Sequence, residues 1–204
     1  MRLTAYERAH KKEKKLARQE RFAIRLTARE ERPPEVRLSP YGKFEFHECL
    51  VPENLVKGGM GSVWVTRRIR HDRLVTGVFL VDIWCMGVKN AFIRRVGVAE
   101  YEHHLAKTAE VDGPVRRVAP EFACKLVCDA VEYAAGLGIA PHRDYAAARE
   151  IFAGVDPSRC EEEFTFGQNG RPLYIQGPFD DPERIFSHLA LQAPGERRAL
   201  EDGT

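Results

Sequence analysis

Alternating apolar and polar positions predict a β-hairpin in the first half of the chain. Residues 62–69 and 74–85 are rich in β-branched and aromatic side chains, and the polar residues 70–73 between them favour a turn. The second run is apolar on both faces, which is typical of a central strand. A shorter alternation at 43–47 indicates another strand.

Helical periodicity is found in four later segments. They cover residues 98–110, 120–136, 144–152 and the stretch that begins at Asp181-Pro182. Asp112-Gly113-Pro114 ends the first helix, and Pro120 lies where the first turn of the second begins. In the last helix we expect Ile185, Phe186 and Leu189 to face inward.

A second hairpin is predicted near the C-terminus. Asn169-Gly170 lies between the apolar segments 164–167 and 172–175, and Asn-Gly between such runs is the strongest short-range hairpin signal. The whole pattern predicts an α+β fold, in which a small antiparallel sheet formed by two β-hairpins packs on the helical middle segment.

The first 33 residues differ from the rest of the chain in composition and charge. Residues 2–31 contain no glycine or proline and favour a helix, which Pro33-Pro34 ends. Residues 1–33 hold eleven Lys and Arg against five acids, a net charge of +6, whereas the rest of the chain carries −4. We therefore expect a projecting basic helix at 1–33, a linker at 34–42, a single α+β domain at 43–193 and a flexible tail at 194–204.

Seven basic residues of this arm are the candidate binding residues. They are Lys11, Lys12, Lys14, Lys15, Arg18, Arg21 and Arg25. On a helix they would line up along a phosphate backbone, where such contacts give affinity without sequence specificity. The interspersed glutamates leave a protein partner as the alternative, and the thin apolar face argues against a lipid surface.

Cysteine usage and the apolar runs bear on the compartment. The five cysteines show no framework spacing, and Met1-Arg2-Leu3 leads into charged residues rather than the apolar run of a signal peptide. The longest apolar stretch, 74–88, has 15 residues and contains Asp82, so it is too short and too polar to span a bilayer. We expect a soluble, cytoplasmic protein that does not bind membranes.

Residues 58–65 resemble the glycine-rich loop of bacterial protein kinases. Such a loop lets backbone N–H groups approach phosphates. A kinase also needs a lysine on the next strand and an Asp-Phe-Gly sequence, and the chain has neither. The favoured interpretation is a glycine turn that enters the hairpin, with an isolated anion-binding loop as the alternative.

Asp82, Lys89 and Asn90 are the candidate catalytic residues. Asp82 shares one face of a predicted strand with apolar neighbours, so its carboxylate needs a partner. Lys89, Arg67 and Arg68 are the cations within reach. A structural ion pair or a strand-end contact is the alternative to catalysis.

Cys124 and Cys128 are the candidate metal ligands. Residues four apart point the same way on a helix. A structural zinc site usually has a second close pair. Apolar residues continue this helix face, so buried thiols that pack as small apolar groups are the favoured interpretation. The sequence implies no cofactor.

Three hypotheses for the function follow, in order of preference. The first is a non-catalytic module that contacts nucleic acid or a nucleoprotein assembly through its basic arm. The second is a small enzyme whose pocket gathers Asp82, Lys89 and a His or Glu of the 98–110 helix. The third is a structural subunit of a protein complex, in which the arm forms an inter-chain helix.

Overall fold

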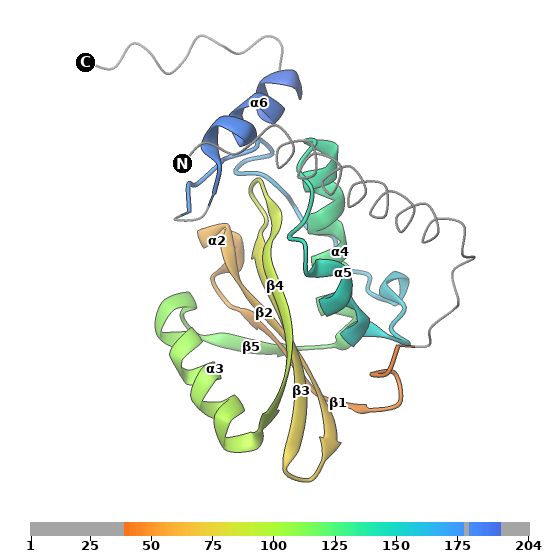
Figure 1. Cartoon of the computed structure of the whole chain (residues 1–204). Helices are drawn as coiled ribbons and strands as arrows, with labels where there is room; N and C mark the ends of the chain where they lie inside the picture. The colour runs from red at the N-terminus through yellow and green to blue at the C-terminus, as the bar shows by residue number, and fades with distance from the viewer. Residues whose placement is uncertain (1–38, 178–179, 193–204) are drawn as a thin grey trace, which may run out of the picture. The chain divides into compact units, whose positions relative to one another are not determined.

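The computed structural model describes residues 39–177 and 180–192 of the chain (Figure 1). Its strands are β1 (Glu45–Pro52), β2 (Met60–Arg70), β3 (Arg73–Asp82), β4 (Gly87–Gly97) and β5 (Val115–Val118). Its helices are α2 (Leu55–Gly58), α3 (Val98–Asp112), α4 (Pro120–Gly136), α5 (Tyr145–Ala148) and α6 (Pro182–Gln192), with the 3-10 turns η1 (Arg149–Phe152) and η2 (Pro157–Arg159). The predicted arm at 1–33, the first part of the linker and the tail at 194–204 lie outside the described residues.

The five strands form one antiparallel sheet in the order β4-β3-β2-β1-β5. β2 and β3 form the predicted hairpin, whose register runs from Met60 opposite Asp82 to Arg70 opposite Arg73. The α+β class is therefore confirmed, but the sheet is larger than two hairpins. β4 pairs with β3 from end to end, and the short β5 pairs with β1.

The predicted second hairpin, over residues 164–175, is wrong. Asn169 and Gly170 do form a turn, with φ of 54° and 78°, but the two sides of the turn share an isolated bridge rather than a ladder. The flanking backbone bonds elsewhere, because the N–H of Gly167 donates to the carbonyl of Ile83 at 2.9 Å. This segment therefore covers the β3–β4 turn instead of adding strands.

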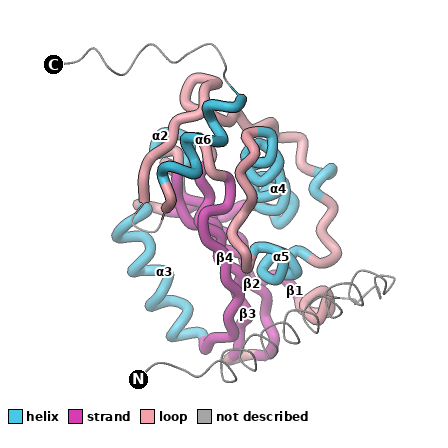
Figure 2. Tube along the Cα trace, turned by 45° about the horizontal axis from the view of Figure 1, so that its top comes forward, coloured by secondary structure: helices cyan, strands magenta, loops and turns pink. Residues whose placement is uncertain are grey.

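Helices cover the two faces of the sheet unequally (Figures 1 and 2). α4, α5 and η1 pack on one face, where the largest apolar cluster lies. Its fully buried side chains include Val65, Phe79, Val127 and Ile151, and each such side chain stabilises the fold by about 1.5–3 kcal/mol. α3 lies across the other face, over a smaller cluster that contains Trp64.

The four predicted helices are present, although the 144–152 segment is divided into α5 and the 3-10 turn η1. In α6, Ile185 is buried as expected. Phe186 does not face inward: it is 58% exposed and lies edge-on to Tyr174. No helix among the described residues is both long enough and apolar enough to cross a bilayer.

The glycine turn before β2 is structural. Gly59 has a φ of 74°, and a Cβ on this residue would overlap the ring of Trp84. The N–H groups of Gly58 and Gly59 donate to the carbonyls of Asn54 and Leu55, each at 2.8 Å. Neither N–H is free to bind a phosphate. The glycine-rich sequence that resembles a kinase loop is explained here by the packing of the Trp84 indole against Gly59.

Candidate functional site

Asp82 caps the turn after β3 instead of pairing with a cation. Its side chain is buried, and its carboxylate accepts the N–H groups of Trp84 and Cys85 at 2.9 and 3.0 Å. Burial raises the pKa of Asp82 against the lowering effect of these backbone bonds. Two of its predicted partners, Arg67 and Arg68, donate to other groups.

Lys89, the third predicted partner, pairs with Asp180, which lies just before α6. The Lys89 Nζ donates to Asp180 Oδ2 at 2.8 Å, and the two side chains are 7% and 11% exposed. The same carboxylate oxygen accepts the hydroxyl of Tyr174 at 3.2 Å. The ion pair therefore connects the segment before α6 to β4. Asn90, the next residue of β4, is exposed to solvent.

The enzyme hypothesis requires a pocket that gathers Asp82, Lys89 and a His or Glu of α3, and the pockets that contain Lys89 and His104 differ from this arrangement. The pocket beside Lys89 is formed largely by the 138–142 loop and α6, and Asp82 is not part of its lining. His104 of α3 lines a different pocket. Lys89 acts to lower the pKa of Asp82 through its charge, but neither of these two pockets gathers Asp82, Lys89 and Asn90.

Cys124 and Cys128 pack against the main core from α4. Cys124 is buried, and the sulfur of Cys128 lies 4.0 Å from the hydroxyl oxygen of Tyr145. A hydrogen bond between the two thiols lowers the pKa of Cys128 and raises that of Cys124. Residues 39–177 and 180–192 contain no group of three His, Cys, Asp or Glu side chains placed to hold a metal ion.

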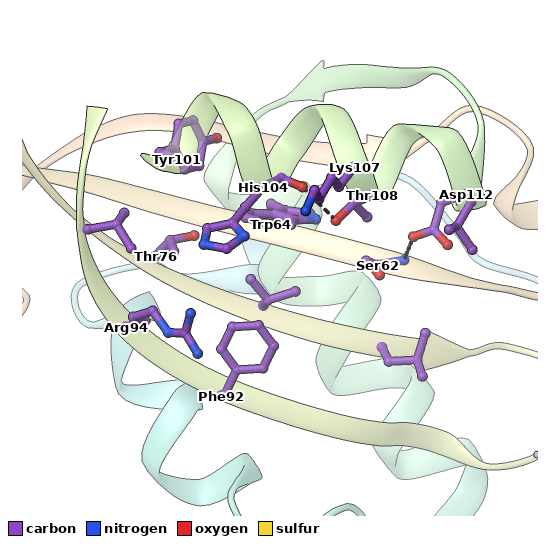
Figure 3. Close-up of a pocket in the computed structure, with 14 residues that line it drawn as sticks. Ser62, Trp64, Thr76, Phe92, Arg94, Tyr101, His104, Lys107, Thr108 and Asp112 are labelled. Atoms are coloured by element: carbon purple, nitrogen blue, oxygen red, sulfur yellow. Dashed lines mark hydrogen bonds between the residues drawn. The ribbon is translucent and has the colours of Figure 1, made fainter. Parts of the chain in front are cut away.

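A groove between α3 and the sheet is the candidate site (Figure 3). Its volume is about 400 Å³. Side chains alternate between the two faces of a strand, so every second residue of β2, β3 and β4 faces α3. Val78, Leu80 and Phe92 form an apolar floor, and His104 and Thr108 belong to the wall that α3 provides.

Trp64 lies in this groove beneath α3. Its side chain is 4% exposed, and its ring is edge-on to that of Tyr101, with 5.9 Å between the centroids. The Tyr101 hydroxyl donates to Glu48 at 2.9 Å. The Trp64 Nε1 has no hydrogen-bond partner among the described residues. Such a buried donor is uncommon, and leaving it unpaired costs about 1–3 kcal/mol.

Two cationic side chains reach the groove from opposite sides. Arg94 comes from β4 and Lys107 from α3, and both are exposed (Figure 3). Within the described part of the chain, neither forms an ion pair. Asp112 also lines the groove, but its carboxylate accepts the N–H of Ser62 at 2.7 Å. The groove therefore combines an apolar floor, a buried free donor and unneutralised positive charge.

Five exposed arginines lie at the end of the sheet that carries the β2–β3 turn, and we call this group the arginine end. They are Arg68, Arg70, Arg73, Arg94 and Arg95. The antiparallel register brings them together, since Arg70 lies opposite Arg73 and β4 ends beside the start of β3. None of them pairs with a carboxylate among the residues that the structure describes. The seven candidate arm residues, from Lys11 to Arg25, lie outside those residues.

The groove and the arginine end were not predicted, because both depend on β4, and no strand was predicted over its residues. A period-two signal for β4 exists: Phe92, Arg94 and Val96 face α3 and alternate with Ala91 and Ile93. Two adjacent arginines within it obscure the alternation of apolar and polar residues. Comparison of the chain with protein-family models, curated proteins and solved structures finds no match, so geometry and chemistry carry the functional argument.

Proposed function

We propose that the chain is a non-catalytic module that contacts nucleic acid through its phosphates. The arginine end is the observation that carries this proposal, because its five exposed guanidinium groups lack acidic partners among the described residues. Guanidinium groups donate paired hydrogen bonds to phosphate oxygens and stay charged at physiological pH. The predicted basic arm at 1–33 would add contacts of the same kind.

The spacing of the arginine end favours a polymer of phosphates over a single anion. Its side chains come from β2, β3 and β4, and neighbouring strands lie about 4.8 Å apart, so the group spans about 10 Å across this end of the sheet. Arg94 faces α3 and Arg95 the opposite face, so a strand that passes around the end of the sheet would contact both. A nucleic-acid strand places one phosphate about every 3.4 Å along its axis, so about three phosphates fit this span. Contacts of this kind are made to the backbone, and we expect little sequence specificity.

A salt titration of binding to generic duplex and single-stranded oligonucleotides tests the proposal. The logarithm of the affinity falls linearly with the logarithm of the salt concentration, by about 0.9 per phosphate contact on duplex and about 0.7 on single strands. Replacing Arg70, Arg73 and Arg95 with glutamine in the full chain should reduce the slope by about 2–3.

A matched variant separates local contact from net charge. Lys57, Arg143 and Arg184 are exposed and lie outside the arginine end. Changing these three to glutamine alters the net charge equally, but it should leave the slope close to that of the unmodified chain. If both triple variants lower the slope equally, the arginine end has no special role.

The arm is tested in the same assay. Changing Lys11, Lys12, Lys14 and Lys15 to glutamine in the full chain should reduce the slope by about 3 if each contacts a phosphate of a single strand. If the unmodified chain binds neither duplex nor single strands at low salt, the proposal is wrong. A protein partner would then be the better explanation of the arm.

A further inference from the structure

We propose that the groove between α3 and the sheet binds a small organic anion with a flat, apolar body. The proposal is carried by the size of the groove, the unpaired indole donor within it and the charge of its lining. It does not depend on nucleic-acid binding, because Arg94 is the residue of the arginine end that also lines the groove and the other lining residues lie outside that group.

The groove has the dimensions of a small-molecule site. Its volume of about 400 Å³ lies in the range of about 300–1,000 Å³ that is typical of ligand pockets. Its floor is apolar, and Phe92 is 41% exposed there although it is aromatic. The Arg94 guanidinium lies over the Phe92 ring at 5.7 Å from its centroid, so a flat ring would pack beside it on the exposed part of Phe92 and remove that apolar surface from water.

Trp64 supplies a directional contact. Its side chain is more than nine-tenths buried, yet the Nε1 donor has no acceptor among the described residues. Figure 3 shows the indole under α3, on the face of the sheet that lines the groove. The nitrogen atom is itself buried, so an acceptor has to displace the side chains that cover it beneath α3. A carboxylate, carbonyl or ring nitrogen of a bound molecule that does so would accept this hydrogen bond and remove the desolvation penalty.

The charge of the lining selects an anion. Arg94 and Lys107 face the groove from its two sides without ion pairs in the described region (Figure 3). Asp112 is already bonded to the N–H of Ser62. The side chain of His104 is half-buried, and its Nε2 lies 3.5 Å from Oε1 of Glu100, one turn earlier on α3. The Arg94 guanidinium also lies over the ring of Phe92, so it contacts the floor of the groove. Two cations without ion pairs, opposite an engaged acid, favour a carboxylate and disfavour a cation.

Trp64 also reports on occupancy, because the chain has two tryptophans and hence two indole N–H resonances. Trp84→Phe assigns them. The probe is 2-naphthoate, titrated into the full chain and followed by ¹⁵N–¹H correlation spectra. We expect the Trp64 indole proton to move downfield as it gains an acceptor, while that of Trp84 stays in place.

Two analogues of the probe test the charge requirement. The amide 2-naphthamide keeps the ring and loses the charge, and we expect it to bind about tenfold more weakly, equivalent to about 1.4 kcal/mol. The cation 2-naphthylmethylammonium should not shift the Trp64 resonance. Equal affinity of all three naphthalenes would overturn the proposal, since the groove would then be only an apolar surface.

Variants on the two walls test the residues. Arg94→Gln and Lys107→Gln should each weaken naphthoate binding about tenfold, the effect of one charge-assisted hydrogen bond. Arg95→Gln is the matched control, because Arg95 is the next residue of β4 and faces away from the groove. Trp64→Phe keeps an aromatic ring against Tyr101 but removes the donor, so it should also weaken binding.

The same variants separate this inference from the proposed function. Arg95→Gln should weaken nucleic-acid binding and leave naphthoate binding intact, whereas Lys107→Gln should do the reverse. Absence of a Trp64 shift up to about 10 mM naphthoate would overturn the inference. So would a Trp64 shift caused by single-stranded RNA but not by naphthoate, since the groove would then belong to the nucleic-acid surface.

Discussion

Replacing Arg67 with methionine tests whether a buried cation joins separate parts of the chain. Arg67 lies on β2 and is 3% exposed. Its Nε donates to the carbonyl of Ile151 at 2.7 Å, its Nη1 to Phe44 at 2.6 Å and its Nη2 to Ala153 at 2.5 Å. The guanidinium also stacks on Phe46, 3.7 Å from the ring centroid. Through these hydrogen bonds, one side chain of β2 connects Phe44, at the start of the described domain, and the end of η1 to the sheet.

The cost of the substitution follows from the groups that it leaves unpaired. The bond to Ile151 is buried, and the bonds to Phe44 and Ala153 are partly buried. A buried carbonyl without a donor costs about 1–3 kcal/mol, and one that water can reach costs less. Methionine offsets part of this because it removes a charge that was costly to bury. We expect a loss of about 2–4 kcal/mol from a total of about 5–15 kcal/mol.

Urea unfolding followed by tryptophan fluorescence measures this loss. With a slope of about 2 kcal/mol per molar urea, the midpoint should fall by about 1–2 M. Arg68→Met is the matched control, because Arg68 is the next residue on β2 and is exposed. Its effect should stay within about 0.5 kcal/mol.

The pH dependence gives a second check on Arg67. Burial lowers the pKa of this guanidinium, yet an arginine keeps its proton in folded proteins. The difference between Arg67→Met and the unmodified chain should therefore be constant from about pH 6 to about pH 9. Equal urea midpoints for Arg67→Met and Arg68→Met would refute the argument.

Three further substitutions test the turn, the strand end and the C-terminal contact. Gly59→Ala should lower the melting temperature by about 5 °C or more, because its Cβ would overlap an indole ring, whereas Gly58→Ala meets open space and should change it by less than about 2 °C. Burial raises the pKa of Asp82, so as the pH falls the folded state binds a proton at this carboxyl before the unfolded state does. The unmodified chain should therefore become more stable relative to Asp82→Asn as the pH is lowered from about 7 towards the ordinary aspartate pKa of 3.8, and urea titrations measure this difference. Burial acts to raise the pKa of Asp180, but the hydrogen bonds from Lys89 and neighbouring groups outweigh this effect and keep the carboxylate ionised. Asp180→Asn removes the ion pair that holds the segment before α6 against β4, so tryptic cleavage in α6, measured by mass spectrometry, should become several-fold faster.

Local sequence patterns were sufficient for elements whose partners are close in the chain. The β2–β3 hairpin needs only two β-rich runs and the polar turn between them. α4 starts at Pro120, where a missing N–H costs nothing, and its apolar stripe lies on the main core. These elements are specified by neighbouring residues, so the pattern alone identifies them.

The elements that were missed depend on distant parts of the chain. β5 has four residues with adjacent Arg116 and Arg117 at its centre, and it exists because β1, far earlier in the sequence, offers a free edge. At Asn169-Gly170 the turn forms as predicted, but the carbonyl of Ile83 takes the backbone bond of a flanking residue that a ladder would have used. When backbone groups distant in the chain compete for the same hydrogen bonds, the local sequence pattern does not reveal the outcome.

The partners of the candidate catalytic residues could not be predicted for the same reason. Asp82 is satisfied by backbone N–H groups of the next turn, and Lys89 by Asp180, a residue from the other end of the domain. A sequence shows that a buried carboxylate needs a partner, but it does not show which group provides it. Asp82 and Lys89 both have partners within the fold, whereas the Nε1 of Trp64 has none among the described residues.

The existence of the groove can be traced to the way in which α3 is attached. Tyr101 is the one buried residue of this fifteen-residue helix, so α3 is not held by a continuous apolar stripe. Near its start, the Tyr101 hydroxyl donates to Glu48 at 2.9 Å; at its end, Asp112 accepts the N–H of Ser62 at 2.7 Å. In the middle turns of α3, the partly buried Leu105 packs against the cluster that contains Trp64, whereas Lys107 is exposed. Lys107 and Thr108 also lie in these turns, and they line the groove with polar groups where a continuous apolar stripe would have filled it with a core.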